Sequence, residues 1–244
     1  MNENLFVVTP SRGRPGPCRA MVESIKATST VKVGIIVALD DDDPRLTEYN
    51  CNDMRPLILP RTNTVGATNA AAALALTMGA TIVVAVGDDM IFKKPGWDVA
   101  LINAIATYPD RIVFATELSD MTVNDGTIIA LTKEVIIIMG HYFWPNYEHY
   151  HADTWLQDIA GKTGRRVYAV EGTFQHNHQQ FDETHKFRIR DNHTHIVADE
   201  QRAAREDAAK NEIIAKLIQY TKYYATAPKT VPFVAGPPEY INKS

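Results

Sequence analysis

The sequence contains few cysteines and no long apolar segment. Its only two cysteines, Cys18 and Cys51, are far apart in the chain. This excludes a disulfide-rich scaffold and a zinc site built from cysteines, and it predicts a reducing compartment such as the cytoplasm. No apolar run approaches the roughly 18 residues of a membrane-spanning helix. The first residues also lack the basic start and apolar stretch of a signal peptide, so we expect an intracellular protein without a membrane partner.

The chain also lacks an excess of positive charge. It has 25 Lys and Arg against 29 Asp and Glu, a net charge of −4, which excludes a generally polybasic nucleic-acid-binding protein. Hydrophobic residues make up 45% of its 244 residues, enough to bury a core. The length lies near the upper limit for one core and predicts one α/β domain with extensions.

Apolar strands alternate with helices in the first hundred residues. The sequence predicts strands at 5–9, 32–39, 56–59 and 81–86, and helices at 18–28, 45–51 and 65–78. The run at 81–86 is made of small and β-branched residues, which is typical of a central strand buried on both faces. This alternation predicts a mostly parallel, Rossmann-type sheet flanked by helices.

The second half is less regular and ends in a polar region. We predict helices at 97–107, 132–139 and 152–162, and strands at 111–116, 127–131 and 166–175. A polar stretch rich in His and Arg follows at 176–194. A long charged helix is expected over about 196–224, and a proline-rich tail after it.

Three polar loops follow predicted strands: 10–14, 40–43 and 87–89. In open parallel sheets, ligands bind at the carboxyl ends of the strands. Paired carboxylates such as Asp88 and Asp89 suit Mg²⁺ or Mn²⁺, and arginines opposite them would neutralise a diphosphate. The pattern therefore favours a nucleotide-diphosphate ligand. The alternatives are a solvated turn at 40–43, a turn with a helix cap at 88–89, and surface arginines.

Four segments together resemble the family 2 type of glycosyltransferases with the GT-A fold. They are LFVVTPSRGRP (5–15), VALDDDDP (37–44), NTVGATNAAAA (63–73) and VAVGDDMIFKKPGW (84–97). The resemblance extends over about residues 5–185. Its most specific part is the ordered series that ends in Asp88-Asp89 and Pro95-Gly96-Trp97.

The resemblance implies a nucleotide site and a metal site. The family's metal motif is Asp-x-Asp, whereas this chain has Gly87-Asp88-Asp89, and by position we assign the metal ligand to Asp89, with Mn²⁺ or Mg²⁺ as the cofactor. The nucleotide contacts are expected from the first loop, the end of the second strand, the third loop and helix, and the metal motif. They are Thr9, Pro10, Arg12, Arg14, Asp40, Asp41, Arg61, Gly66, Asn69 and Asp88.

All eight histidines lie between His141 and His195. His176 and His178 are two residues apart at the end of a predicted strand, so they would face the same side if the strand continues. The resemblance implies that one of them completes the metal shell. The alternative is a polar loop in which the histidines are incidental.

The resemblance also implies an acidic general base at the start of a helix. The matching residue is Asp153, although the glutamate that usually precedes it is Ala152. Asp153 would deprotonate an acceptor hydroxyl, with inversion at the sugar carbon. The alternative is an ordinary helix N-cap.

These expectations define a metal-dependent glycosyltransferase. It would move a sugar from a nucleotide-diphosphate sugar, UDP by family habit or GDP, to a hydroxyl of a cytoplasmic acceptor. We predict a catalytic domain over 1–195, with a nucleotide half over about 1–97 and an acceptor half over about 98–195. Residues 196–244 would form a C-terminal extension of helix and proline-rich tail. The sequence leaves the oligomeric state open.

Two other functions stay open. A sugar-nucleotide nucleotidyltransferase would share the sheet and the metal, but it needs a glycine-rich loop with a lysine after the first strand, where this chain has arginines and prolines. A catalytically silent domain that binds nucleotides or glycans would not need Asp89, Asp153 and His178.

The acceptor is the least specified partner, and a hydroxylated nucleobase in DNA, a small metabolite and a protein side chain all stay open. Lys186, Arg188 and Arg190 alternate after the metal-site histidines, and Arg12, Arg14 and Arg19 cluster elsewhere. If these side chains lined one groove, they would track a phosphate backbone, and a hydroxymethylated DNA base would be the acceptor, as in compact phage-type enzymes acting in the host cytoplasm. The alternative is a solvated helix face.

Overall fold

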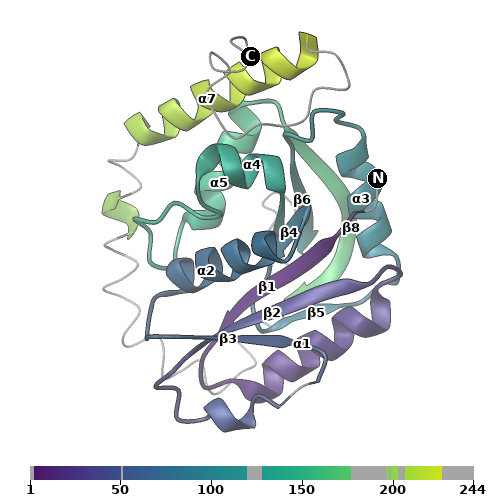
Figure 1. Ribbon diagram of the computed structural model, residues 1–244, viewed down its shortest axis with the longest axis vertical. Helices are drawn as coiled ribbons and strands as arrows, with labels where there is room; N and C mark the ends of the chain where they lie inside the picture. The colour runs from purple at the N-terminus through teal and green to yellow at the C-terminus, as the bar shows by residue number, and fades with distance from the viewer. Residues whose placement is uncertain are drawn as a thin grey trace.

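An eight-stranded sheet crosses the molecule, with strand order β3-β2-β1-β4-β7-β6-β8-β5 (Figure 1). The computed structural model describes residues 3–50, 52–119, 128–176, 197, 199–202 and 207–226, with the backbone alone at 116–119 and 170–173. The strands are β1 (Leu5–Ser11), β2 (Val33–Asp40), β3 (Arg55–Leu59), β4 (Ile82–Ala85), β5 (Met90–Phe92), β6 (Phe114–Ser119), β7 (Ile128–Thr132) and β8 (Arg166–His176). β1 to β4 pair in parallel, as do β6 and β8, whereas β7 and β5 run antiparallel to their neighbours. The predicted mostly parallel α/β sheet is confirmed.

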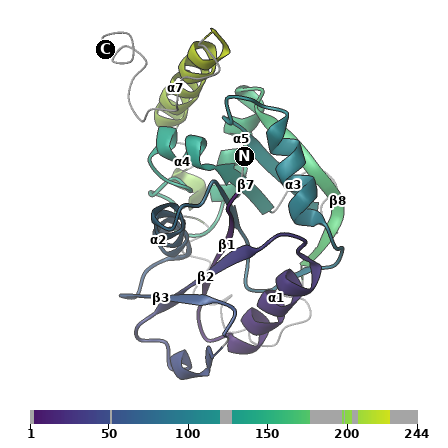
Figure 2. The ribbon, with the colours of Figure 1, turned by 45° about the vertical axis from the view of Figure 1, so that its right-hand side comes forward.

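Helices cover both faces of this sheet (Figure 2). They are α1 (Pro15–Thr28), α2 (Thr64–Thr77), α3 (Trp97–Ala106), α4 (Lys133–Met139), α5 (Ala152–Lys162) and α7 (Asp207–Thr226), with the short 3₁₀ helix η1 (Leu46–Glu48). One apolar core lies between the sheet and α2, α4 and α5, and a second lies between the sheet and α1 and α3. α7 packs outside α4 and α5 and adds Ile213, Leu217 and Tyr220 to the first core.

Alternation along β1 divides its side chains between the two cores. Phe6 and Val8 point into the core under α2, whereas Leu5 and Val7 point into the core under α1. Gly34 lies opposite Phe6 on β2, and a Cβ there would collide with the Phe6 ring. The neighbouring strand therefore needs glycine at this position.

β4 is the central strand that the sequence predicts. It lies between β1 and β7, and all four of its residues are buried. Its carboxyl end leads directly into Gly87, Asp88 and Asp89. The paired acids therefore lie at the middle of the sheet's carboxyl edge.

Several predicted bounds differ from those observed. β5 was not expected, because only three residues separate the acidic turn from Lys93. α1 begins at Pro15 rather than at 18, since proline is well suited to the first turn of a helix. The single helix expected over 196–224 is wrong. α7 begins at Asp207, and the helical residues 199–202 lie apart from it (Figure 1). Among the described residues, no helix is long and apolar enough to cross a membrane.

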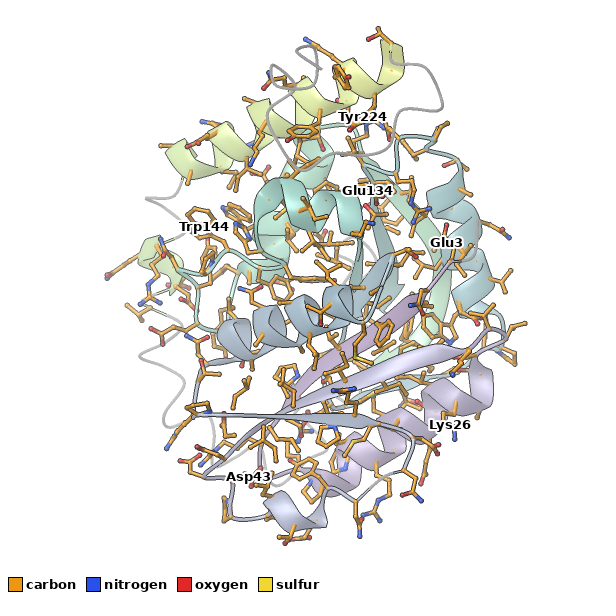
Figure 3. The ribbon with its side chains drawn as sticks, in the orientation of Figure 1. Glu3, Lys26, Asp43, Glu134, Trp144 and Tyr224 are labelled. Carbon is orange, nitrogen blue, oxygen red and sulfur yellow. The ribbon has the colours of Figure 1, made fainter. Side chains whose placement is uncertain are left out.

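Charged side chains gather at both ends of the parallel strands. At the amino end of β1, Arg111 pairs with Glu3 at 2.5 Å and with Glu134 at 3.6 Å. Asp43 lies at the opposite end of the sheet, among the loops that follow β1 and β2 (Figure 3). Arg12, Arg14 and Asp40, which were selected from the sequence, belong to this second end.

Candidate active site

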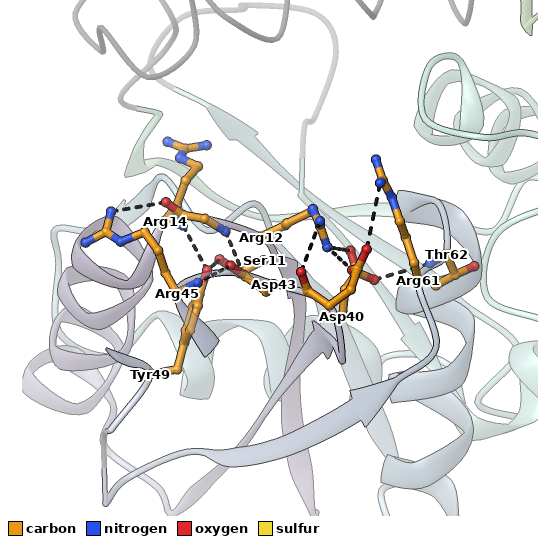
Figure 4. A network of polar contacts seen from close by, with 11 residues as sticks. Ser11, Arg12, Arg14, Asp40, Asp43, Arg45, Tyr49, Arg61 and Thr62 are labelled. Carbon is orange, nitrogen blue, oxygen red and sulfur yellow. Dashed lines mark hydrogen bonds and ion pairs between the residues drawn. The ribbon is translucent and has the colours of Figure 1, made fainter. Parts of the chain in front are cut away.

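The loops after β1 and β2 meet in one network of hydrogen bonds and ion pairs (Figure 4). The loop after β4 joins this network through Asp88, which contacts Ser11 and Arg14. Two charged members of it, Asp88 and Arg14, are buried, with exposed fractions of 5% and 7%. The Arg14 guanidinium lies 2.9 Å from Asp88 Oδ1, and the Ser11 hydroxyl donates to Asp88 Oδ2 at 2.6 Å. Asp88 is thus held by a cation and a hydroxyl from the loop after β1.

Asp89 lies beside the same arginine and faces β8. Its Oδ2 lies 3.3 Å from Arg14 Nη1, and its Oδ1 lies 3.3 Å from His176 Nε2. Burial alone would raise the pKa of Asp89, but His176 and Arg14 outweigh it and lower the pKa to about 2. Gly87 makes this arrangement possible, since a Cβ there would lie 2.7 Å from Asp89 Oδ1. Asp89 is therefore an ionised carboxylate at neutral pH.

Asp89 and His176 fit the requirements of a divalent metal in part. A carboxylate and an imidazole facing each other are suitable ligands for Mn²⁺. Among the residues with described positions, no group of three or more His, Cys, Asp or Glu could hold a metal ion. Small divalent ions commonly take one or two protein ligands and complete their shell with substrate phosphates and water. The residues present match a site of this open kind.

A second ion-pair cluster lies at the end of β2. Arg12 donates to Asp40 Oδ2 at 2.9 Å and also pairs with Asp42. The backbone N–H of Thr62 donates to Asp40 Oδ1 at 3.2 Å, which connects the loop before α2 to β2. Arg61 is well exposed and lies 3.8 Å from Asp42. Both oxygens of Asp40 are therefore engaged within the protein.

Three further residues in this network were not selected from the sequence. Tyr49 brings its hydroxyl 3.0 Å from Ser11 Oγ and accepts from the backbone N–H of Arg14 at 2.9 Å. Burial raises the pKa of Tyr49 to about 12. Asp43 accepts from Gly13 N–H at 2.7 Å and so fixes the turn in which Gly13 has a φ of 69°. Ser11 and Asp43 lie in the polar loops 10–14 and 40–43 that the sequence singled out, whereas Tyr49 gave no local signal.

The remaining predicted nucleotide contacts lie around this network in different ways. Thr9 is fully buried within β1, so its side chain does not line a site, and Pro10 is partly exposed at the strand end. Asp41 is exposed, and its backbone N–H donates to Leu59. Gly66 N–H is capped by Asn63. Asp41 is therefore accessible to a nucleotide, whereas Thr9 is buried in the fold.

Asn69 serves as a tether between α2 and the loop after α4. Its Oδ1 accepts from Tyr142 N–H at 3.1 Å and from Phe143 N–H at 2.8 Å, and its Nδ2 donates to Phe143 O at 2.9 Å. Both ends of the amide are therefore committed to backbone groups. The contacts of Asn69 in this structure stabilise the fold, and its expected nucleotide contact stays a prediction.

Asp153 lies in the first turn of α5, as predicted, and is partly exposed. Its carboxylate accepts from Thr154 N–H at 2.8 Å. The preceding loop is fixed from two sides: Asp199 accepts from the backbone N–H groups of Glu148, His149 and Tyr150, and His149 lies 2.8 Å from Thr64 Oγ1 at the start of α2. These contacts connect the loop before Asp153 to the start of α2, and Thr62 continues the connection to Asp40.

Some predicted residues lie outside the described residues or do not gather as expected. His178, Lys186, Arg188 and Arg190 are outside them. Arg12 and Arg14 are paired with different carboxylates, and Arg19 bonds to Glu48 O and Asn50. The basic groove that a DNA acceptor would need therefore stays a prediction.

The comparisons with known proteins identify the fold. No protein-family model matches the sequence, and no curated protein matches it. A mannosyltransferase, PcManGT of Pyrobaculum calidifontis solved with GDP-Man and Mn²⁺, matches with a TM-score of 0.58 and 15% identity. That match covers 99% of this chain and 79% of the other.

S. aureus TarS has a similar structure. Its 1–349 fragment matches with a TM-score of 0.52 and 11% identity, over 93% of this chain and 73% of that one. The same fragment in complex with UDP matches with a TM-score of 0.51 and 12% identity over 70% of this chain, which spans 60% of that fragment. At these identities the likeness establishes the fold alone, which is GT-A-like and shared with glycosyltransferases.

Proposed function

We propose that this chain is a metal-dependent glycosyltransferase that uses a nucleotide-diphosphate sugar. The observation that carries the proposal is the constellation of Asp89, His176 and buried Arg14 at the carboxyl end of the central strand. In open α/β sheets this edge is where nucleotides bind. The fold is shared with one protein solved with UDP and another solved with GDP-Man and Mn²⁺, which supports the same ligand class here.

Each part of the site has a chemical role in this proposal. Asp89 and His176, with His178 as the other candidate, would hold Mn²⁺ or Mg²⁺, which offsets the negative charge of the leaving diphosphate. Arg14 would contact the diphosphate, and Asp40, Asp41 and Arg12 would lie toward the nucleoside. UDP is the first nucleotide to test and GDP the second.

Asp153 would act as the general base. A carboxylate in the first turn of a helix, partly exposed and fixed by the loop before it, can accept the proton of an acceptor hydroxyl as the oxygen attacks the sugar carbon. Attack opposite the departing diphosphate inverts that carbon. The acceptor is a hydroxyl compound, and modified DNA is one arm of the acceptor screen.

Asp89→Asn tests the metal site. The variant keeps the size of the side chain and loses its charge, so Mn²⁺-dependent binding of UDP or GDP should fall at least about 100-fold, since even residues behind a metal ligand are worth 10–100-fold. Calorimetry with and without Mn²⁺ measures this, and a melting temperature within a few degrees of the native value shows that the fold is intact. Equal metal-dependent binding in both proteins would place the site elsewhere.

Hydrolysis of a nucleotide-sugar separates the proposed enzyme from a silent binding domain. The native chain with Mn²⁺ should release UDP or GDP slowly from its own donor, whereas a binding domain should retain the donor intact. Formation of a nucleotide-sugar from a nucleoside triphosphate and a sugar phosphate would instead identify a nucleotidyltransferase.

A further inference from the structure

Arg14 occupies an unusual position for a residue that is expected to bind a substrate. Its side chain is 8% exposed, and one nitrogen, Nη1, lies within 2.9 Å of Asp88 and 3.3 Å of Asp89. Two adjacent buried carboxylates repel each other unless a cation lies between them. In this structure that cation is the arginine, which lies beside the carboxylate assigned to the metal.

We propose that Arg14 is the internal counter-ion of the acidic pair and that it makes metal binding depend on the nucleotide diphosphate. A guanidinium and a divalent cation beside the same two carboxylates repel each other strongly in a buried site. A diphosphate supplies the additional negative charge that lets both cations remain. This inference rests on the proposed function, because it takes the diphosphate as the ligand.

The structure allows the Arg14 side chain to change partners without moving α1. The backbone N–H of Arg14 is held by the Tyr49 hydroxyl at 2.9 Å, and the turn before it is held by Asp43 through Gly13 N–H at 2.7 Å. Arg14 itself is the N-cap residue of α1. Rotation of the side chain is therefore sufficient to exchange a carboxylate for a phosphate oxygen, a partner that guanidinium groups bind well.

The consequence is a measurable coupling between two ligands. In the native chain, UDP or GDP should raise the affinity for Mn²⁺ at least about fivefold, and Mn²⁺ should raise nucleotide affinity by the same factor, because coupling is reciprocal. Arg14→Gln should bind Mn²⁺ more tightly than the native chain when no nucleotide is present. It should also lose most of the coupling.

The experiment measures free Mn²⁺ by electron paramagnetic resonance, with and without UDP or GDP, for the native chain and three variants. Arg19→Gln removes the same charge from the exposed side of α1, where Arg19 bonds to Glu48 O and Asn50, and should behave like the native chain. Arg14→Lys keeps the positive charge and provides a second measurement if Arg14→Gln folds poorly. Without nucleotide, the affinity of Arg14→Lys for Mn²⁺ should lie between those of the native chain and Arg14→Gln.

The outcomes separate this inference from the proposed function. An unchanged or weaker Mn²⁺ affinity in Arg14→Gln without nucleotide would overturn the inference, as would independent binding of Mn²⁺ and nucleotide to the native chain. Failure of the native chain to bind either nucleotide with Mn²⁺ would overturn the proposed function. In that case the Mn²⁺ affinity of Arg14→Gln, measured without nucleotide, still decides whether Arg14 competes with the metal.

Discussion

The two halves of the sheet hold their polar residues in different ways. On the side of β1, β2 and β4, arginines and aspartates from neighbouring loops pair directly with one another, as Arg12 does with Asp40 and Arg14 with Asp88. On the side of α4 and α5, Asp153 accepts a hydrogen bond from the backbone N–H of Thr154, and the loop before it is held by Asp199. In the first half, side-chain ion pairs position the polar residues before any ligand binds. In the second half, hydrogen bonds between Asp199 and the backbone position the loop that leads to Asp153.

This difference matches the chemistry that each half would perform. A diphosphate and a metal carry high charge, so their site needs compensating charges that are already in place. A general base needs a free carboxylate at the correct place and a rigid support, and extra cations beside it would weaken it as a base. The comparison therefore predicts that variants in the first half weaken donor binding, whereas variants in the second half slow transfer and leave donor binding unchanged.

Asp153→Asn should show the separation most strongly. Sugar transfer should fall by roughly 10²- to 10⁴-fold, the usual contribution of a positioned base, while UDP and Mn²⁺ affinities stay unchanged. Single-turnover transfer and calorimetry measure the two quantities.

Asp158→Asn is a matched control for this variant. Asp158 lies on the same helix but pairs with Lys162 and Lys210, both at 2.9 Å, so its loss should affect stability slightly and transfer little. Near-native transfer by Asp153→Asn would leave Asp153 with a structural role in the first turn of α5, whose N-cap residue is His151.

Asn69→Ala should weaken the attachment of the loop after α4 to α2. The change leaves the N–H groups of Tyr142 and Phe143 without their side-chain acceptor, which should lower the free energy of unfolding by about 2 kcal/mol. Denaturant unfolding measures this loss, and transfer should decline more than UDP binding.

Asn63→Ala, on the same helix, is the matched comparison. It removes only the cap on Gly66 N–H and should cost about 1 kcal/mol, with transfer and binding affected equally. If Asn69→Ala loses more UDP affinity than transfer, Asn69 contacts the nucleotide.

The same contrast explains which features the sequence revealed. The parallel strands and the acidic turn after β4 were predictable because hydrophobic periodicity and paired carboxylates are local signals. Asn69 was assigned to the nucleotide by the family resemblance, and its partners Tyr142 and Phe143 could not be foreseen because they lie more than seventy residues away in the sequence. Asp199 was missed because its backbone partners belong to a loop about fifty residues earlier. Ser11 lies in a polar loop that the sequence singled out, but Tyr49 shows no local pattern, and only the folded chain brings their hydroxyls together.

The smallest expected effect concerns His141, which lies just after α4 beside Trp144 and Trp155. Burial, followed by the charge of Lys216, lowers the pKa of His141 to about 4 from an ordinary value of 6.5. Because the unfolded chain binds the proton more readily, the contribution of His141 is fully present above pH 6.5 and is lost as the pH falls toward 4.

His141→Phe should remove this dependence. Between pH 7 and pH 5 the native chain should lose about 1–2 kcal/mol more stability than the variant, since one pKa unit corresponds to about 1.4 kcal/mol. Phenylalanine retains the aromatic contacts with Trp144 and Trp155, so packing is nearly unchanged at pH 7. Urea unfolding at both pH values measures the difference, and parallel losses in the two proteins would show that the acid sensitivity of this half arises elsewhere. A variant in the charged half, such as Arg19→Gln, should keep the native pH dependence, because the His141 ring and its neighbours are untouched.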